Sequence, residues 1–386
     1  MRIDLVCQVV DNYGDIAVVW RLAQALVQDG PGDLAVRLLV DDLGAFAALN
    51  PNVDPRAARQ ELPCGDSRIT VLRSADVSGV AQPKADVPAD VLVEAFGAPT
   101  PAAWFQAFVD AAKEPGLLRA RVIVHLEYLT AEPWSERYHL LPSPLGFSGV
   151  DRRFFVPGFR PRTGGLVFTD PPAQPAPRGP EDWLMTMFSY EHDFTRFWVD
   201  LMEFLEDRDE TARVLVFAGR SRPGALDSWT RLAGRPGVHR VTVVDQPLVD
   251  QDTYTSLLAS ADFNVVRGEE SWVQALLVGR PFLWHAYLQP EGHQSVKVDA
   301  FLDVWEPWFE PEAAPGAMCF AGVAKEFRSF NRRLVDSTDE PPLEGYRVFW
   351  ENRDLLTRVQ TAWLSDLRKN AKLSRRLLEF LETYRL

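Results

Sequence analysis

Two short acidic loops in separate halves of the chain carry side chains that could move a proton or hold a charged group. Residues 11–15 read Asp-Asn-Tyr-Gly-Asp, and residues 267–272 read Arg-Gly-Glu-Glu-Ser-Trp. Each loop follows an apolar run and precedes a helical pattern, so each is predicted to lie where a strand ends and a helix begins. Two such loops suggest a cleft between two α/β domains, with a diphosphate-linked donor on one side and an acceptor on the other.

The first loop offers two carboxylates, Asp11 and Asp15, four residues apart. One of them could face the cleft as a general base or as an orienter of a nucleophile, and Gly14 would permit the bend that places it there. The structural alternative is that Asp15 caps the following helix, because aspartate is a preferred N-cap residue. The residues alone leave both interpretations open.

The second loop has the features of an anion site. Gly268 lets the backbone turn tightly after the strand, and the amides from Glu269 to Trp272 would be the unsatisfied donors of a new helix, which favour pyrophosphate. Arg267 could add charge-assisted contacts to a phosphate. The two glutamates, Glu269 and Glu270, oppose this interpretation, since carboxylates repel phosphate. The alternative is an ordinary helix start, stabilised by glutamate in its first turn.

Tyr190 ends the first predicted strand of the second half, where it could stack on a nucleobase or be a core residue. Several familiar signals are missing. No Gly-x-Gly-x-x-Gly follows the first strand, which disfavours a nicotinamide oxidoreductase. Asp207-Arg-Asp209 spells a metal-binding pair but lies in a charged stretch, so it is predicted to be a solvated turn. The six histidines show no close ligand pair, so no catalytic metal is expected.

The composition is that of a globular protein of 386 residues, long enough for two domains. The net charge of −13 argues against a general nucleic-acid binder. The three cysteines give no disulfide framework. No signal segment and no apolar run of roughly 20 residues is present, which predicts a cytoplasmic protein without a membrane partner. A basic cluster near the C-terminus is predicted to be a solvated helix face; it comprises Arg368, Lys369, Lys372, Arg375 and Arg376.

Strand candidates alternate with helical patterns in both halves, which predicts parallel sheets with helical crossovers. In the first half the predicted strands are Ile3–Val10, Ala35–Val40, Arg68–Leu72, Val91–Phe96 and Arg121–Leu126, and the predicted helices are Ile16–Val27 and Trp104–Lys113. In the second half the predicted strands are Trp183–Tyr190, Arg213–Phe217, Arg240–Val244, Phe263–Val266 and Phe282–Trp284, and the predicted helices are Asp193–Leu205 and Ser271–Leu277.

A stretch rich in proline and glycine, residues 161–180, is predicted to connect two domains, because it resists regular structure. The predicted domains span residues 1–160 and 181–350, and residues 351–386 form C-terminal helices that could cross back to the first domain. Two Rossmann-like domains facing a central cleft, with a helical C-terminal tail, are the α/β architecture called GT-B in glycosyltransferases. Fold alone does not give function.

A set of short motifs adds specificity through its order and spacing. They are Asp11–Ile16 with Trp20–Leu22, Glu94–Phe96, Leu126–Leu129 with Glu132 and Trp134, Phe155–Phe159, Thr163–Leu166, Phe188–Glu191, Arg267–Glu269 with Ser271, and His285–Gln289. Together, along nearly the whole chain, they resemble the bacterial protein-arginine rhamnosyltransferases that modify elongation factor P, the EarP family.

The resemblance implies an inverting, metal-independent transferase without a cofactor. It would move L-rhamnose from dTDP-β-L-rhamnose to an arginine guanidino nitrogen of elongation factor P, with the acceptor on the first domain and the nucleotide sugar on the second. It implies Asp15 as the general base, Asp11 as holder of the guanidinium or support for Asp15, and Glu269 as an assistant at the reaction centre. The residues that it implies in substrate or donor binding are Asn12, Tyr13, Gly14, Tyr190, Leu248, Gln251, Arg267, Gly268, Glu270 and Ser271.

Two positions depart from the family pattern. Glu270 stands where aspartate is usual and is one methylene longer, so its donor contact is expected to be shifted or relayed. Leu248 replaces an aromatic residue that would stack on thymine, whereas Gln251 is retained and could pair with a base edge. Two other hypotheses remain: a GT-B transferase with another sugar nucleotide or acceptor, and a non-catalytic translation-factor binding protein. The retained carboxylates disfavour the second, because binding alone needs no base.

Overall fold

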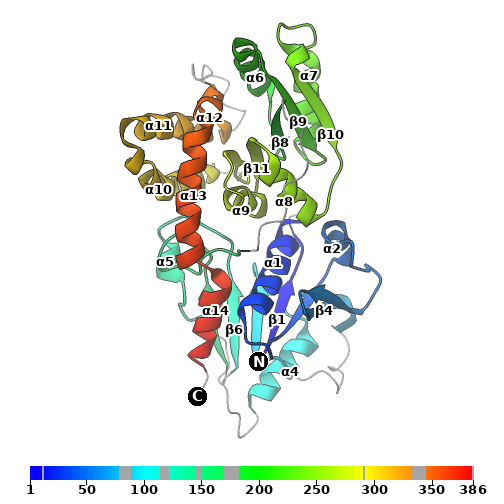
Figure 1. Cartoon of the computed structure of the whole chain (residues 1–386). Coiled ribbons are helices and arrows are strands. Elements are labelled where there is room, and N and C mark those ends of the chain that lie inside the picture. Colours follow the sequence, from blue (N-terminus) through cyan, green and yellow to red (C-terminus); the bar gives the residue numbers. More distant parts are fainter. Residues whose placement is uncertain are drawn as a thin grey trace. The chain divides into compact units, whose positions relative to one another are not determined.

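The computed structural model describes residues 1–10, 13–77, 88–113, 121–143, 150–168, 182–289, 292–332 and 345–384. The chain divides into two compact units (Figure 1). Residues Met1–Asp170 and Leu367–Leu386 form the first unit, and Pro171–Asp366 form the second. The last helix of the chain therefore belongs to the unit that contains the first strand.

The first unit is built on a seven-stranded sheet with the order β3-β4-β2-β1-β5-β6-β7. Its strands are β1 (Arg2–Cys7), β2 (Ala35–Val40), β3 (Arg59–Cys64), β4 (Ser67–Arg73), β5 (Val91–Ala95), β6 (Val122–Leu126) and β7 (Asp151–Phe155). Neighbouring strands are parallel except for the antiparallel hairpin of β3 and β4. The expectation of a wholly parallel sheet is wrong at this edge. In β3 exposed Glu61 is followed by buried Leu62, an alternation that a search for continuous apolar runs does not detect.

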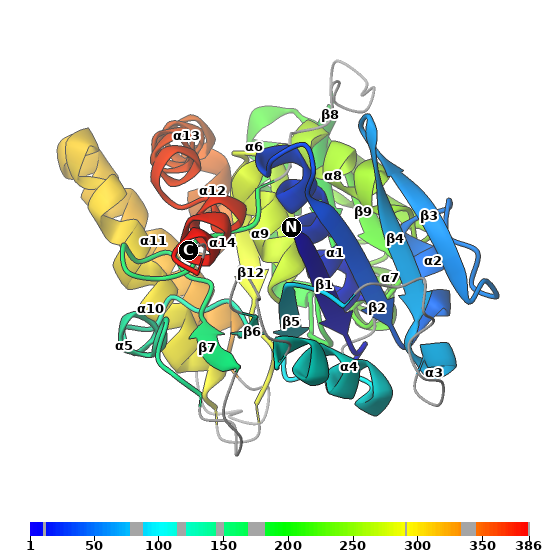
Figure 2. The same cartoon turned by 90° about the horizontal axis from the view of Figure 1, so that it is seen from below.

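Helices cover both faces of this sheet (Figure 2). Helices α1, α2 and α14 pack on one face, where Ile3 and Leu5 are buried, and α4 packs on the other, against Val6. Apolar residues on both faces explain why β1 reads as a near-continuous apolar run, interrupted by Asp4. The helices of this unit are α1 (Gly14–Asp29), α2 (Leu43–Leu49), α3 (Ser74–Val77), α4 (Ala102–Ala112), α5 (Ser135–Tyr138) and α14 (Leu373–Glu382).

The second unit has a five-stranded sheet with the order β10-β9-β8-β11-β12, and every neighbouring pair is parallel, as predicted. Strand β8 ends at Met187, so Tyr190 lies in the loop after the strand and not within it. The strands are β8 (Asp182–Met187), β9 (Thr211–Phe217), β10 (Val241–Gln246), β11 (Phe263–Arg267) and β12 (Phe282–His285). The helices are α6 (Thr195–Arg208), α7 (Arg222–Arg231), α8 (Gln251–Ser260), α9 (Glu270–Leu277), α10 (Gln294–Trp305), α11 (Ala313–Phe330) and α12 (Arg347–Glu351).

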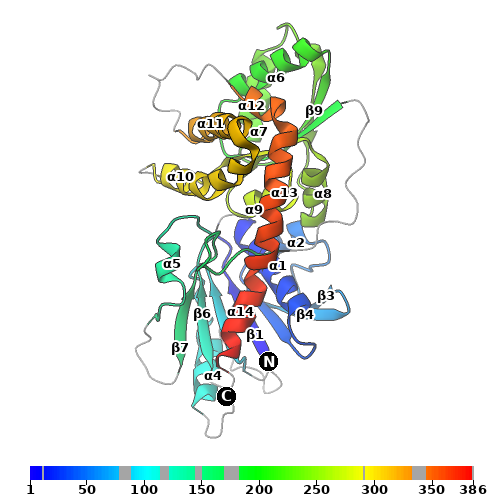
Figure 3. The same ribbon diagram turned by 60° about the vertical axis from the view of Figure 1, so that its left-hand side comes forward.

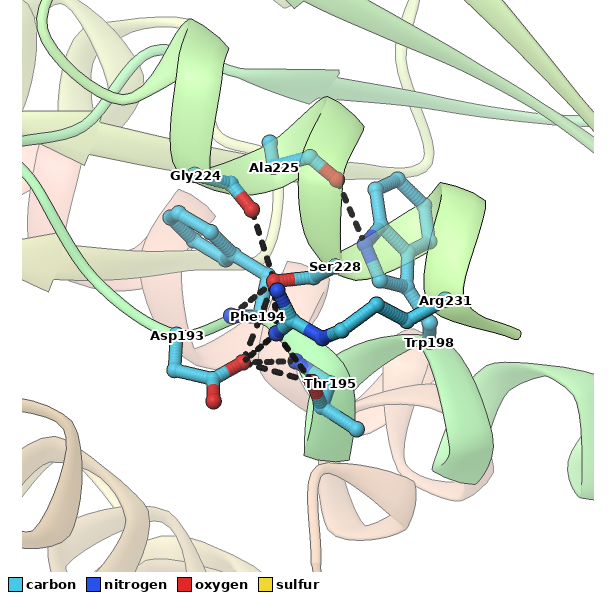
Figure 4. Close-up of polar contacts among 8 residues, drawn as sticks. All are labelled: Asp193, Phe194, Thr195, Trp198, Gly224, Ala225, Ser228 and Arg231. Carbon is cyan, nitrogen blue, oxygen red and sulfur yellow. Dashed lines mark hydrogen bonds and ion pairs between the residues drawn. The ribbon is translucent and has the colours of Figure 1, made fainter.

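Helices α6 and α7 are joined by polar contacts close to the loop that holds Tyr190 (Figure 4). The Oδ1 atom of Asp193 accepts hydrogen bonds from the Thr195 amide at 2.9 Å and from the Ser228 hydroxyl at 3.0 Å. Burial opposes ionisation of this carboxyl, but these hydrogen bonds hold the pKa of Asp193 below its usual value. The Trp198 indole donates to the Ala225 carbonyl at 3.1 Å. Together these contacts fix the start of α6.

The unit boundary falls inside α13 (Arg353–Asn370), after which the chain turns into α14 (Figure 3). The apolar side of α14 packs against α1, where Leu373 and Leu377 are buried. The solvated face predicted for the basic cluster is wrong for Lys372 and Arg376. Lys372 pairs with buried Asp29 at 2.7 Å. Arg376 donates to the Thr163 carbonyl, and its partial burial lowers its pKa.

No helix in the described part of the chain combines the length and the apolar character that a membrane crossing requires.

Candidate active site

The acidic loop of the first unit leads into α1, and Asp15 is the second residue of that helix. Asp15 is only 3% exposed. Its Oδ2 accepts a hydrogen bond from the Val10 amide at 2.8 Å, and its Oδ1 accepts one from the Tyr128 hydroxyl at 3.3 Å. The helix has Tyr13 as N-cap and no side-chain cap. The alternative that Asp15 caps α1 is therefore wrong, because its side chain turns back toward the loop.

The rest of this loop is described in part. Asp11 and Asn12 lie outside the described residues. Tyr13 accepts a backbone hydrogen bond from Ala17 through its carbonyl. Gly14 is the first residue of α1 and is not among the glycines with positive φ, so the glycine bend expected at this position is not formed there. Tyr13, the described residue before it, has an ordinary φ of −114° and ψ of −12°.

Two aromatic residues from neighbouring strand ends support the Asp15 carboxylate. Phe96 follows β5, and Tyr128 follows β6; their rings stack with centroids 4.4 Å apart and an angle of 13° between planes. Phe96 has a φ of +57°, which is unusual for a bulky residue. The sequence motifs contain both residues but gave neither a role. Their link to Asp15 follows from the order of the strands in the sheet. Strand β5 lies between β1 and β6, so the segments that follow these three strands lie near one another.

The second acidic loop forms the tight turn that its glycine predicts. Strand β11 ends at Arg267, Gly268 has a φ of +59°, and α9 begins at Glu270 after the N-cap Glu269. The turn is fixed through both backbone groups of Gly268, one bound to a carbonyl and the other to an indole. The Gly268 amide donates to the His285 carbonyl at 3.2 Å, and the Trp284 indole donates to the Gly268 carbonyl at 2.8 Å. The helix start is thereby held at the end of β11.

Arg267 lies among aromatic rings at this strand end. Its guanidinium carbon is 4.4 Å from the ring centroid of Phe188 and 4.9 Å from that of Tyr190. Its Nη1 atom is buried and has no hydrogen-bond partner within the described part of the chain. A second cation that the sequence did not single out, Arg220, lies 5.3 Å from the Tyr190 ring and pairs with Glu191 at 2.8 Å. Two guanidinium groups, those of Arg267 and Arg220, therefore lie at the ring of Tyr190.

Both glutamates of the loop have partners in the same unit. Glu269 pairs with Lys297 of α10 at 3.6 Å, and Glu270 accepts a hydrogen bond from the side-chain amide of Gln251 at 3.2 Å. Lys297 carries no motif, so the sequence gave no signal for it. The predicted repulsion between these carboxylates and a phosphate is reduced, because each side chain is engaged by a cation or an amide. Ser271 is buried in the first turn of α9.

The remaining residues assigned to the donor differ in burial. Tyr190 is 2% exposed and has edge contacts with His285 and Tyr287, as the core interpretation predicts. Leu248 lies between β10 and α8 and is 38% exposed. Gln251 begins α8 and is buried. An exposed apolar side chain at Leu248 is available to a ligand, but it lacks the planar face of an aromatic ring.

Two histidines, buried His285 and half-buried His192, lie beside Tyr190 and contact each other. Burial, together with the charges of His192 and two arginines, lowers the pKa of His285 to about 3. Burial likewise lowers the pKa of His192 to about 4. The Nδ1 atom of His285 is 2.8 Å from the Ser189 hydroxyl. Both imidazoles are therefore neutral near pH 7 and belong to the packing that supports the loop.

The acidic pair Asp207 and Asp209 lies at the end of α6, as the turn interpretation predicts. Asp207 pairs with Arg347, and Asp209 pairs with Arg240 at 2.8 Å. Across the described ranges, no group of three or more His, Cys, Asp or Glu side chains is arranged to hold a metal ion.

Comparison with known proteins places these residues in one family. The family model described as elongation factor P (EF-P) rhamnosyltransferase EarP matches residues 3–171 and 172–382. A protein-arginine rhamnosyltransferase from Pseudomonas putida is 38% identical over 78% of this chain and 80% of its own length. One from Pseudomonas aeruginosa is 37% identical over 86% of this chain and 91% of its own.

A solved structure that concerns EarP-mediated arginine glycosylation of translation elongation factor EF-P is also similar to this chain. Its TM-score is 0.54 at 21% sequence identity, with 99% of each chain covered. At that identity the likeness bears on the fold. Two Rossmann-like units with a helical C-terminal segment make the chain a member of the GT-B class, as its element order predicts.

Proposed function

The chain belongs to the EarP family of elongation factor P rhamnosyltransferases and is a protein-arginine rhamnosyltransferase, and from this premise we propose the finer reaction. It transfers L-rhamnose from dTDP-β-L-rhamnose to an arginine guanidino nitrogen of elongation factor P, with inversion at the sugar carbon and without a metal or other cofactor. A translation factor as acceptor implies a reaction in the cytoplasm.

The second unit is proposed to hold the donor, and Arg267 is the observation that carries this proposal. A buried guanidinium nitrogen without a hydrogen-bond partner in the described residues is costly unless a ligand satisfies it. A diphosphate oxygen would do so with a charge-assisted hydrogen bond. Gly268, Ser271 and the first amides of α9 offer further donors to the same anion. The ring of Tyr190 packs against the Arg267 guanidinium. Gln251 and Glu270, which are hydrogen-bonded to each other, are proposed to contact the nucleoside.

The first unit is proposed to act on the acceptor. A guanidinium is planar, protonated and a poor nucleophile, so a carboxylate must orient it and take a proton as the new bond forms. We assign proton uptake to Asp15 and orientation of the guanidinium to Asp11, with Asn12, Tyr13 and Gly14 in the adjoining loop. Asp15 is buried, which strengthens its interaction with a cation relative to water.

The proposed step balances as a single displacement. A guanidino nitrogen attacks the anomeric carbon from the face opposite the diphosphate, so a β-linked donor gives an α-linked product. The bond from the anomeric carbon to the diphosphate oxygen breaks, and dTDP leaves with the electron pair. The proton released from the guanidinium passes to Asp15. Glu269 is proposed to assist by stabilising positive charge on the sugar, with Lys297 fixing its carboxylate.

The test uses the full chain, dTDP-β-L-rhamnose and purified elongation factor P. Mass spectrometry should show addition of one deoxyhexose to the factor, mapped to an arginine. Asp15→Asn should lower turnover by at least about 100-fold, because it removes the proton acceptor. Asp66→Asn, at an exposed turn of the same unit, is the matched control and should transfer at the wild-type rate. Transfer by Asp15→Asn close to the wild-type rate would refute the base assignment.

Donor identity needs a separate measurement. Thermal unfolding with dTDP-rhamnose, UDP-glucose and GDP-mannose should show stabilisation by the thymidine nucleotide, because a ligand that binds only the folded state raises its stability. Equal stabilisation by another sugar nucleotide would instead favour a transferase with a different donor.

A further inference from the structure

We propose that Tyr128 is a positioning residue for the Asp15 carboxylate during arginine rhamnosylation, and that Phe96 holds Tyr128 in place. The proposal rests on the proposed role of Asp15 as base. The motif Leu126–Leu129 contains Tyr128 but gives its hydroxyl no role, and the hydrogen bond to Asp15 joins residues 113 positions apart in the sequence.

The carboxylate of Asp15 receives a donor on each oxygen. The Val10 amide donates to Oδ2 at 2.8 Å, and the Tyr128 hydroxyl donates to Oδ1 at 3.3 Å. The first bond comes from the backbone of the same loop, whereas the second comes from another strand end. Two donors on different oxygens restrict rotation of the carboxylate plane, which a single donor would leave free. The hydroxyl of Tyr128 therefore sets the direction in which Asp15 presents its lone pairs.

The Tyr128 contact is long for a hydroxyl donor. A hydroxyl usually lies about 2.7–2.8 Å from the oxygen that it bonds, whereas this contact is 3.3 Å. At that length the hydroxyl gives the carboxylate a direction without binding it tightly, so that a substrate N–H group can also approach Oδ1.

The position of Tyr128 is itself fixed by a strained neighbour. The Phe96 amide donates to the Leu126 carbonyl at 2.7 Å, which joins the end of β5 to the end of β6. Phe96 adopts a left-handed φ of +57°, and its ring lies flat against Tyr128. A bulky residue keeps such a conformation only where surrounding contacts compensate for it. The stacking contact is the one that aims the tyrosine toward Asp15.

Tyr128 also lies where an acceptor can reach it. The residue is 41% exposed although its hydroxyl contacts a buried carboxylate. Strands β1, β5 and β6 are adjacent and parallel, so the segments that follow them meet at one edge of the sheet. A purely structural tyrosine at this edge would need its ring and not its hydroxyl. Replacement of Tyr128 by phenylalanine, which removes only the hydroxyl oxygen, therefore separates a structural role of the ring from a positioning role of the hydroxyl.

The decisive variant is Tyr128→Phe in the full chain. Loss of one hydrogen bond to a charged group should lower kcat by about fivefold to tenfold. KM for elongation factor P and the Kd for dTDP-rhamnose should stay within about twofold, since neither binding contact is removed. The matched control is Tyr138→Phe, an exposed tyrosine of α5 whose ring packs against Trp134. It should transfer at the wild-type rate.

A double variant shows whether the hydroxyl acts through Asp15. In the Asp15→Asn background, adding Tyr128→Phe should lower the residual rate no further, because coupled residues are not additive. An unchanged kcat in Tyr128→Phe would overturn the proposal. So would an equal loss in both backgrounds, which would place the hydroxyl outside the Asp15 contact. If the wild-type chain transfers no sugar at all, the proposed function fails, and that result is distinct from an active enzyme indifferent to Tyr128→Phe.

Discussion

The guanidinium of Arg267 lies over the ring of Tyr190, with its central carbon 4.9 Å from the ring centroid. A cation over an aromatic face is held in direction without using its N–H groups. One of those groups, on Nη1, is buried and unpartnered in the described residues. The arrangement leaves an N–H group that can bind an anion at the end of β11. The proposed binding of the nucleotide sugar at this loop can therefore be tested directly.

Replacement of Arg267 should weaken donor binding. Arg267→Ala removes a charge-assisted hydrogen bond, so the Kd for dTDP should rise by about 10- to 100-fold in isothermal titration. Arg328→Ala is the control, since it removes an exposed arginine of the same unit that pairs with Asp299. Equal affinity in wild type and Arg267→Ala would exclude the arginine from the donor site.

The turn after Arg267 should tolerate no side chain. Gly268→Ala places a Cβ atom at a φ of +59° and 3.2 Å from the Tyr190 hydroxyl. The left-handed conformation should cost about 1–2 kcal/mol of stability, and the contact should also weaken dTDP binding. Gly234→Ala tests the strain alone, because Gly234 has a φ of +87° with open space around it. A similar loss of affinity in both variants would show that the Tyr190 contact has no specific effect.

An aromatic residue at position 248 should improve thymine recognition. Leu248 is 38% exposed, so phenylalanine can be placed there without disturbing a core. Stacking on the base should lower the Kd for dTDP by about threefold to tenfold. Val296→Phe, at another exposed position of the second unit, should have no effect. A Leu248→Phe enzyme with unchanged affinity would place thymine elsewhere.

Acid should destabilise the second unit through two histidines, buried His285 and half-buried His192. The pKa of His285 is lowered to about 3 and that of His192 to about 4, whereas an unfolded histidine titrates near about 6.5. Between these values the unfolded chain binds more protons, so stability is full above pH ~6.5 and is lost as the pH falls toward 4. The expected slope is roughly 1.4 kcal/mol per pH unit for each histidine.

Urea unfolding followed by tryptophan fluorescence measures this slope. His192→Phe keeps a ring against Phe194 and Phe330 but cannot be protonated, so its urea midpoint should fall less steeply between pH 7 and 5. His239→Gln removes an exposed histidine and should follow the wild type. If His192→Phe loses stability as steeply as the wild type, protonation of His192 is not the source of the loss.

The sequence predicted the parts of the fold that local pattern controls. Strand β1 and the turn at Gly268 follow from a buried apolar run and from a glycine at a strand end. Strand β7, with the sequence Asp-Arg-Arg-Phe-Phe, lay outside the predicted strands because its polar residues hide the pattern. Strand β3 was missed for the same reason, because it begins with the polar residues Arg-Gln-Glu.

The candidate site was predictable only where residues carry chemistry by type. Asp15 and Arg267 stand out as a carboxylate and a cation in strand-end loops. Tyr128 and Lys297 became visible only when the fold joined distant segments: Tyr128 to Asp15, and Lys297 to Glu269. Likewise, the sequence predicts that Lys372 is solvated, because its partner Asp29 lies 343 residues earlier in the chain.

The placement of α14 has a consequence for biosynthesis. The core under α1 includes Leu373, Leu377 and Leu381 from the last turns of the chain. A nascent polypeptide therefore exposes this apolar face of α1 until α14 has been made and has left the ribosome. The order usual for multidomain proteins, in which the first part made is the first to fold, is reversed here, because the core of the first unit stays incomplete until the second unit has been synthesised.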